Sequence, residues 1–174
     1  MTNWTDLELT LLGEGSTLYA LVDAAQFMDL VDRLENLQVQ FRSLYEGPEG
    51  EQLEDVAPFL VSLGVRDSRS RFFESQWPKN AGIFFVSSAS FDEVRRHLRH
   101  FLKVKTWAGD DLFFRFYDPR VLQAFLPTCS AEQLKDFFGP VKAFSVAATG
   151  REFWVYRLDS NGLQTSTVGS AKEN

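Results

Sequence analysis

The run at residues 112–120 is the part of the sequence whose residue types most directly indicate a binding surface. It reads Leu-Phe-Phe-Arg-Phe-Tyr-Asp-Pro-Arg, so an arginine lies among four aromatic residues. If this run is a strand, alternate side chains share a face, and Phe113, Arg115 and Tyr117 lie together. That face then belongs either to a partner-binding surface or to the internal structure of the domain.

Arg115 needs a partner in either case, because a bare guanidinium buried among aromatic side chains is very costly. Asp118 or an acid from another segment, such as Glu46, can supply the opposite charge. A structural clasp would join the end of the strand to the start of the following helix. A partner-binding role would instead direct the guanidinium at another molecule, and the sequence leaves both interpretations open.

A second group of candidate residues is a set of cations on one predicted helix and just after it. As a solvated helix face the set needs no further explanation. As a docking surface it would suit an acidic partner. Nucleic acid is disfavoured because no aromatic residues are interleaved with the cations to form a stacking platform. The set comprises Arg95, Arg96, Arg99, Lys103 and Lys105.

Catalytic and metal-binding patterns are absent from the sequence. It contains no glycine-rich dinucleotide or phosphate loop, no His-Glu-x-x-His and no Gly-x-Ser-x-Gly. His97 and His100 have cationic neighbours that repel a metal ion, and Cys129 has no nearby histidine to act as a base. Adjacent carboxyls, as at Asp110-Asp111, are typical of turns and caps rather than of acid–base pairs. We therefore expect no enzyme activity, no metal and no cofactor.

Composition and charge fit one globular domain. The chain has 174 residues, 44% hydrophobic and 24% charged, with a net charge of −6. Residues 1–60 carry −10 and residues 61–120 carry +4, an acidic balance that disfavours general binding to nucleic acid. No apolar run approaches the roughly 18 residues of a membrane span, and the start lacks a cationic signal region. We expect a cytoplasmic protein without membrane contact.

Hydrophobic periodicity predicts the elements that position these residues: one α/β domain with a mixed β-sheet flanked by α-helices and a C-terminal β-hairpin. Residues 18–23 and 39–45 are predicted strands around a helix that ends near Asn36, a βαβ unit with parallel strands. Further strands are predicted at 59–63 and 82–86. A polar turn at 46–50 precedes a short helix at 51–56, and another helix is predicted at 67–77.

The C-terminal half carries clearer start signals for its elements. Capping boxes begin two helices, at Ser90–Glu93 and at Ser130–Gln133, and Asp118 with Pro119 begins a third between them. Two hairpins are predicted, joining 103–107 to 112–117 and 141–148 to 152–159. The domain then spans residues 18–159, after an N-terminal extension of residues 1–17 with a weak strand at 7–12. Residues 160–174 are expected to form a flexible polar tail.

Three pieces of the sequence together resemble a known family. They are the opening Tyr-Ala-Leu-Val-Asp at residues 19–23, Phe-Arg-Ser-Leu-Tyr-Glu-Gly at 41–47, and Phe-Arg-Phe-Tyr-Asp-Pro-Arg at 114–120. Between them lie Val-Ala-Pro-Phe-Leu at 56–60 and the strand–helix segment at 82–102. Their order and spacing are similar to those of the type VI secretion effector chaperones, also called adaptor proteins (Tap or TEC), over residues 18 to 146.

This resemblance implies a non-enzymatic cytoplasmic protein of Gram-negative bacteria that is not itself secreted. Such proteins bind a toxic effector, or its spike-tip (PAAR-like) region, and help to load it onto the VgrG spike. Many members carry a further variable C-terminal region, so we expect effector choice here to rest on the core domain or on another protein. The matching residues are contacts or structural signatures: Tyr45, Glu46, Arg115, Tyr117, Asp118 and Arg120.

The residues and the resemblance agree on a binding module without catalytic equipment, and we predict a type VI effector adaptor. Two other functions stay open. An immunity or regulatory protein would bind and neutralise a toxin. A small hydrolase would need a cleft that holds two inward carboxyls from different segments. The candidate partner-binding residues are Tyr45, Glu46, Arg95, Arg96, Arg99, Phe113, Arg115, Tyr117, Asp118 and Arg120.

Overall fold

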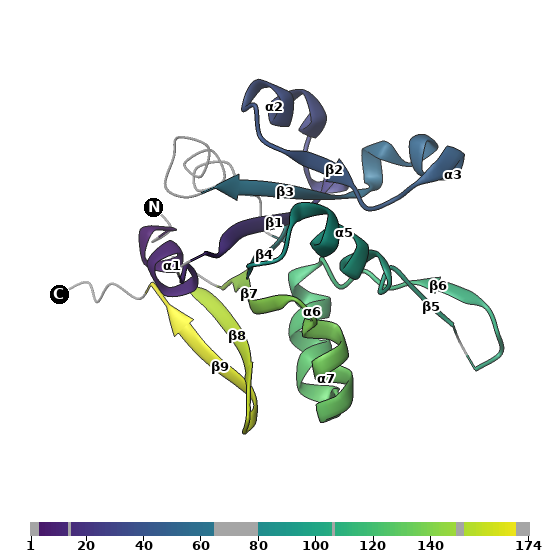
Figure 1. Ribbon diagram of the computed structural model, residues 1–174. Coiled ribbons are helices and arrows are strands. Elements are labelled where there is room, and N and C mark those ends of the chain that lie inside the picture. Colours follow the sequence, from purple (N-terminus) through teal and green to yellow (C-terminus); the bar gives the residue numbers. More distant parts are fainter. Residues whose placement is uncertain (1–3, 14, 65–79, 106, 149–151, 170–174) are drawn as a thin grey trace.

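A seven-stranded sheet runs through the molecule in the order β2-β3-β1-β4-β7-β8-β9 (Figure 1). The computed structural model describes residues 4–13, 15–64, 80–105, 107–148 and 152–169. The predicted helix at 67–77 lies outside these residues. The strands of the sheet are β1 (Thr17–Asp23), β2 (Phe41–Ser43), β3 (Pro58–Gly64), β4 (Gly82–Ser87), β7 (Val141–Ala147), β8 (Phe153–Asp159) and β9 (Gly162–Val168).

The centre of the sheet is built from the most apolar segments of the chain. All six residues of β4 are buried, as are six of the seven in β1, which fits strands covered on both faces. β1 pairs with β3 on one side and with β4 on the other, both antiparallel. β1 and β2 run in the same direction, as the βαβ pattern predicts, but β3 lies between them. Each described strand pair is antiparallel, so the parallel strand pairing that the βαβ pattern predicted does not occur.

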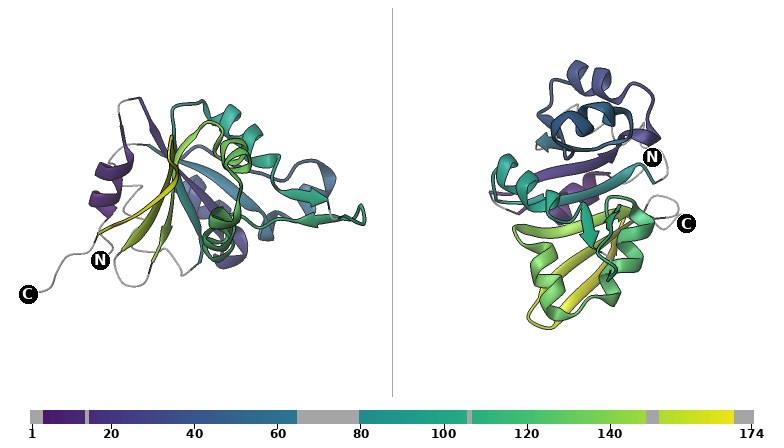
Figure 2. Two further views of the ribbon diagram at one scale, coloured as in Figure 1. Left: turned by 90° about the horizontal axis from the view of Figure 1, so that it is seen from below. Right: turned by 90° about the vertical axis from the view of Figure 1, so that its right-hand side faces the viewer.

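Helices cover both faces of this sheet (Figure 2). On one face, α1 (Trp4–Leu11) and α2 (Leu30–Asn36) pack on an apolar cluster that includes Phe84 and Phe153. On the other face, α5 (Phe91–Arg99), α6 (Pro119–Phe125) and α7 (Ala131–Phe138) enclose an aromatic cluster around Phe137. A single α/β domain with helices on both sides of the sheet and a C-terminal hairpin confirms the predicted fold class.

The three helices of the aromatic face begin where their capping residues predict. Ser90 and Ser130 each accept a hydrogen bond from the third helical amide, and Glu93 and Gln133 accept one in return from the cap backbone. Asp118 caps α6 through the amide of Arg120. Side-chain capping of this kind depends on local sequence alone, which explains why these helices were predicted with correct starts.

Both ends of the described chain differ from their prediction. The expected weak strand at 7–12 is part of α1, whose residues Leu7 and Leu11 are buried at the helical spacing of four. The expected tail at 160–174 contains β9, which pairs with β8 along all seven of its residues. Asp159 accepts a hydrogen bond from the Asn161 amide and Gly162 takes a φ of 105°, so a tight turn reverses the chain here.

Two elements lie beside the main sheet. A short two-stranded sheet, β5 (Lys103–Lys105) with β6 (Asp111–Phe113), projects from the body of the molecule in Figure 1 and in the left view of Figure 2. α3 (Gly47–Gln52) occupies the segment predicted as a turn. A single helical turn, η2 (Glu54–Val56), follows it, and another, η1 (Ala24–Gln26), comes directly after β1. Pro48 in the first turn of α3 fits this helix start, which the composition of the segment concealed.

Candidate functional site

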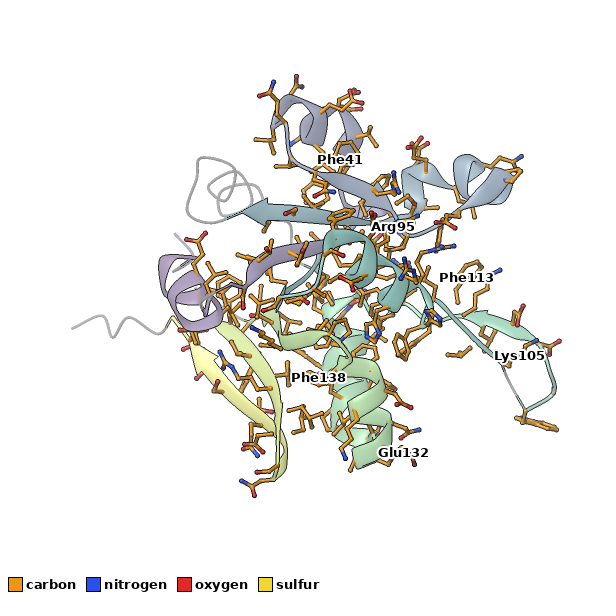
Figure 3. The ribbon with its side chains drawn as sticks, viewed as in Figure 1. Phe41, Arg95, Lys105, Phe113, Glu132 and Phe138 are labelled. Carbon is orange, nitrogen blue, oxygen red and sulfur yellow. The ribbon has the colours of Figure 1, made fainter. Side chains whose placement is uncertain are left out.

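The basic face of α5 is folded against the segment that joins β2 to α3. Arg95 donates through Nε and NH2 to the carbonyl of Ser43, at 2.9 and 2.7 Å, and its NH1 lies 2.5 Å from Glu46 Oε1. Arg99 donates from Nε to the carbonyl of Leu44 at 2.9 Å and pairs with Glu46 Oε2 at 2.5 Å. Two arginines one helical turn apart therefore hold one carboxylate and two backbone carbonyls. Figure 3 labels Arg95 on α5.

This arrangement corrects the prediction of one solvated basic face. The Arg95 side chain is only 9% exposed, because its helix packs directly against the β2 side of the sheet. Hydrogen bonds and charge from Arg95, together with Arg99, hold the pKa of Glu46 below its ordinary value. Arg96 does lie exposed. Lys105 is also exposed, 3.4 Å from Asp111 across the hairpin.

Arg115 makes a clasp with an acid that the sequence analysis did not name. Its NH2 group lies 2.5 Å from Asp23 Oδ2 at the end of β1. Asp23 is 2% exposed at its side chain and also caps η1 through the Ala25 amide. The Arg115 guanidinium lies 5.6 Å from the centre of the Tyr117 ring. The prediction of an acid from another segment is correct, whereas Asp118 and Glu46 have other partners.

The predicted strand face at 113–117 does not form, because β6 ends at Phe113 and the chain turns at Phe116 and Tyr117. Both of these residues are buried, so alternation beyond Phe113 no longer places side chains on one face. Burial and the neighbouring Tyr45 raise the pKa of the Tyr117 hydroxyl. Tyr117 therefore belongs to the core of the domain rather than to an open surface.

Asp118 and Arg120 form a local pair at the start of α6. Arg120 donates from Nε and NH2 to the two carboxylate oxygens of Asp118, at 3.0 and 2.6 Å. These bonds, with the backbone amide of Arg120, keep the pKa of Asp118 below its ordinary value although burial opposes the shift. Asp118 is buried, and the Arg120 side chain is 70% exposed. The pair shapes the helix start and leaves an exposed guanidinium edge.

A groove of about 280 Å³ opens between α3, the end of α5 and the root of the projecting hairpin. In its lining the rings of Tyr45 and Phe113 contact each other at a tilt of 56°, with centroids 5.6 Å apart. The Lys103 ammonium lies 5.4 Å from the centre of the Phe113 ring. We call this the α3–hairpin groove; its lining residues are Leu44, Tyr45, Glu46, Gly50, Leu53, Arg99, Leu102, Lys103 and Phe113.

Four of the predicted partner-binding residues meet in this groove, namely Tyr45, Glu46, Arg99 and Phe113. They come from segments up to 68 positions apart, so the predicted sheet and helices alone could not bring them together. Arg95 lies behind the groove, where it holds Glu46. The other five predicted residues do not line it: Arg96, Arg115, Tyr117, Asp118 and Arg120.

Exposed apolar side chains lie at the groove and along the hairpin, and of these the sequence analysis selected only Phe113. Trp107 at the hairpin tip is fully exposed, Phe113 is 55% exposed, and Val104 and Leu112 are also exposed. Leu53 is exposed at the end of α3. A sequence signal was present in the hairpin, because a tryptophan beside Ala-Gly-Asp-Asp lies in a turn that is too short to bury it. Val104 pairs with Leu112 and Lys103 with Phe113, so Val104 and Leu112 lie on the hairpin face opposite to the groove. Exposed apolar side chains on a projecting hairpin are typical of sites that contact another protein.

Little in the described part of the chain supports a catalytic site. A second hollow of about 440 Å³ holds carboxyls from two segments, including Asp29 and Glu54, but both side chains are exposed rather than inward. Among the described residues no group of three or more histidine, cysteine or acidic side chains could hold a metal ion. Burial raises the pKa of Cys129. His97 contacts the Phe137 carbonyl at 2.9 Å.

Within the described residues no helix has the length and apolar character needed to cross a membrane.

The second hollow and the α3–hairpin groove differ in character. Both combine apolar and charged side chains, but the charged residues that line the second hollow are all acids, whereas the groove is lined by two cations and one acid. Only the groove collects residues that the sequence analysis selected as candidates for partner binding. It is therefore the best-supported candidate site.

Comparison with known proteins gives two matches. The model of a family described as a domain of unknown function (DUF4123) matches residues 18–136. Accessory protein VasW of Vibrio cholerae serotype O1 (strain ATCC 39315 / El Tor Inaba N16961) is 31% identical over 129 residues, which are 72% of this chain and 43% of VasW. The match thus spans less than half the length of that relative. No solved structure matches the chain significantly.

Proposed function

Because the chain belongs to the DUF4123 family, the type VI secretion adaptor family to which its motifs point, we propose that it is an effector chaperone. In this role it binds one toxic effector, or the effector's spike-tip (PAAR-like) region, in the cytoplasm. It then promotes loading onto the VgrG spike. The protein acts by holding another protein and catalyses no reaction.

The observation that carries this proposal is the α3–hairpin groove together with the exposed apolar hairpin beside it. Trp107 is fully exposed and Phe113 more than half exposed, although a soluble monomer gains stability by burying such side chains. Aromatic side chains at the centre of an interface commonly contribute most of the binding free energy. A protein partner that covers this surface would account for its composition.

The geometry also revises which residues are candidates for contact. Arg95, Asp118 and Tyr117 are buried in the domain and stabilise its elements. Arg99 and Glu46 line the groove while holding each other, so they shape it and present partial charge to a partner. Charge reversal of Arg95 would therefore test folding rather than docking. Substitutions at the exposed residues of the hairpin test docking directly.

Deletion of the gene, followed by measurement of secretion, tests the proposed function. We expect delivery of one specific effector to be lost while the secretion machine still fires and releases its other substrates. The effector should co-purify with the wild-type chain from the native cytoplasm, together with a spike component. Unchanged delivery of all effectors in the deletion strain would contradict the proposal.

An immunity protein predicts a different outcome from the same strain. Loss of an immunity protein would make the cell sensitive to its own toxin without blocking delivery. An adaptor should hold the transport region of the effector, and the toxin domain should remain active in the complex. Measurement of toxin activity in the purified complex therefore separates the two functions. Inhibition of the toxin by the bound chain would favour immunity.

A further inference from the structure

We infer that the α3–hairpin groove recognises a partner segment in which apolar side chains lie next to a carboxylate. The inference rests on the proposed function, because it names the chemistry of the segment that the chaperone would hold. It follows from three properties of the groove: its apolar lining, its excess of positive charge, and the position of one lysine on an aromatic wall.

The apolar part of the recognition comes from the floor and the two walls of the groove. Leu44 and Leu102 form a buried floor. Leu53 on the α3 side and Phe113 on the hairpin side are walls with exposed faces. A volume of about 280 Å³ falls just below the range of roughly 300–1,000 Å³ that is typical of pockets enclosing a drug-sized ligand. The groove thus suits apolar side chains of a longer segment better than a separate small molecule.

The charged part comes from an imbalance at the groove. Arg99 and Lys103 line it and Arg95 lies directly behind it, while Glu46 is the acid among its lining residues. Among the side chains that the structure describes here, three cations and one carboxylate leave an excess of two positive charges. Glu46 already pairs with both arginines, so an incoming carboxylate meets cations whose charge is only partly balanced. Carboxylates form stronger hydrogen bonds with such donors than neutral groups do.

Lys103 fixes how the two parts are arranged. Its ammonium lies over the Phe113 ring, at 5.4 Å from the centroid, so the positive charge is directly beside the apolar wall. A partner that places an apolar side chain on Phe113 therefore brings its neighbouring residue within reach of Lys103. The recognised pattern is an apolar residue with an aspartate or glutamate close to it in space.

The net charge of −6 for the whole chain does not oppose this arrangement at close range. Interactions between exposed charges are largely screened beyond about 8 Å at physiological ionic strength. Exposed acids at the second hollow, such as Asp32 and Asp55, do not line the groove. The groove is therefore a local positive site on an acidic protein, and its preference depends on its own residues.

A library of random 16-residue peptides displayed on phage, selected against the purified full-length chain, tests the inference. We expect the enriched peptides to combine large apolar residues with aspartate or glutamate and to exclude lysine and arginine. Fluorescence polarisation with the best synthetic peptide then measures affinity. Enrichment of basic peptides, or no enrichment above that for an unrelated acidic protein, would overturn the inference.

Substitutions in the groove and matched controls outside it locate the binding. Phe113→Ser and Leu53→Ser should each weaken the peptide by about thirtyfold, the loss expected for a buried apolar anchor. Met28→Ser, an exposed apolar residue at the second hollow, should leave affinity unchanged. Circular dichroism melting of each variant shows whether it is folded. Equal loss in Met28→Ser and Phe113→Ser would place the binding elsewhere.

A charge exchange at Lys103 gives the sharpest result. Lys103→Glu should weaken the selected peptide and should strengthen a matched peptide whose acid is replaced by lysine. Lys135→Glu, an exposed lysine on α7 away from the groove, is the control and should change neither affinity. If Lys103→Glu leaves the preference for acidic peptides intact, the assignment of the carboxylate to this site is wrong.

The native effector separates failure of this inference from failure of the proposed function. Suppose that the deletion strain no longer secretes the effector, yet the effector binds equally well to the wild-type chain and to the Phe113→Ser and Lys103→Glu variants. The chain is then a chaperone that uses another surface. If delivery is unchanged in the deletion strain, the proposed function itself is wrong. If both groove variants lose the effector while Met28→Ser retains it, function and surface are both supported.

Discussion

The basic face of α5 and the β5–β6 hairpin lie on either side of the same groove, yet their side chains serve opposite purposes. On α5, Arg95 and Arg99 bind carbonyls and a carboxylate of their own chain. On the hairpin, Trp107 and Phe113 expose apolar surface to solvent. The two charged side chains thus bind groups within the domain, whereas the two large apolar side chains, which gain most from burial, are exposed to solvent.

This difference teaches that residue type alone does not mark a binding surface. An arginine can serve either a structural or a binding role, because its guanidinium can donate hydrogen bonds to carbonyls of its own chain or to carboxylates of a partner. An exposed tryptophan has no such internal role here, since its removal from water requires a second molecule. If the contrast is correct, substitutions on α5 should affect folding, and substitutions on the hairpin should affect partner binding.

The largest loss of stability is expected for Arg95→Ala. Removing this side chain leaves the Ser43 carbonyl and the Glu46 carboxylate without their main donor, at a cost of about 3 kcal/mol in the free energy of unfolding. The melting temperature should fall by about 6–12 °C in a chain of this length. Arg96→Ala, the exposed neighbour, should stay within about 0.5 kcal/mol. Equal melting temperatures for the two variants would break the contrast.

Arg115→Ala should have the next largest effect, about 2 kcal/mol, because it leaves the buried Asp23 carboxylate without its cation. The loss is smaller than for Arg95 since Arg115 is half exposed and water can reach its place. Arg120→Ala removes an exposed arginine and should cost less than about 1 kcal/mol. Urea denaturation of the three proteins measures these differences. A larger loss for Arg120 than for Arg115 would reverse their structural roles.

Acid should weaken the α5 clasp through Glu46. The pKa of this carboxyl is lower in the folded state than its ordinary value of 4.5, so the clasp contributes stability that is present above that value. The contribution is lost as the pH falls through the folded pKa. We expect the difference in urea midpoint between wild type and Glu46→Gln to be clear at pH 7 and to shrink toward pH 3. A constant difference over this range would show that the charge of Glu46 is irrelevant.

The smallest effect on stability is expected on the hairpin, and this sharpens the contrast most. Trp107→Ser should change the free energy of unfolding by less than about 0.5 kcal/mol, because the side chain is fully exposed. Retention on a hydrophobic-interaction column should fall in the same variant. A clear drop in melting temperature would show that Trp107 packs on the domain and does not belong to an open surface.

The predictable parts of the fold were those with local signals. Ser90, Asp118 and Ser130 form their helix caps with residues only two or three positions away, and these starts were predicted correctly. β9 was missed because its short polar sequence shows no buried face, although the Asn161-Gly162 pair is a common hairpin signal. Its pairing with β8 supplies the order that its composition does not.

The site was predictable in its members but not in its geometry. Tyr45, Glu46, Arg99 and Phe113 were all selected from the sequence, and the structure gathers them in one groove. What the sequence analysis missed was burial: Arg95 and Arg96 are adjacent and chemically identical, yet only one faces β2. Helical spacing places Arg95, four residues after Phe91 and three before Leu98, on the buried stripe of α5, although its charge argues for exposure.

The contact between the two ends of the described chain has a consequence during synthesis. Arg157 on β8 donates to the Thr10 carbonyl in α1, and Leu7 and Leu11 pack in the same cluster as Phe153 and Val155. Some 157 residues separate Leu11 from the end of β9 at Val168. At roughly 5–20 residues per second, about 8 to 30 s pass between their emergence from the ribosome. α1 can therefore make these contacts only after β8 has emerged, and until then the apolar side that Leu7 and Leu11 present stays open to other proteins in the cell.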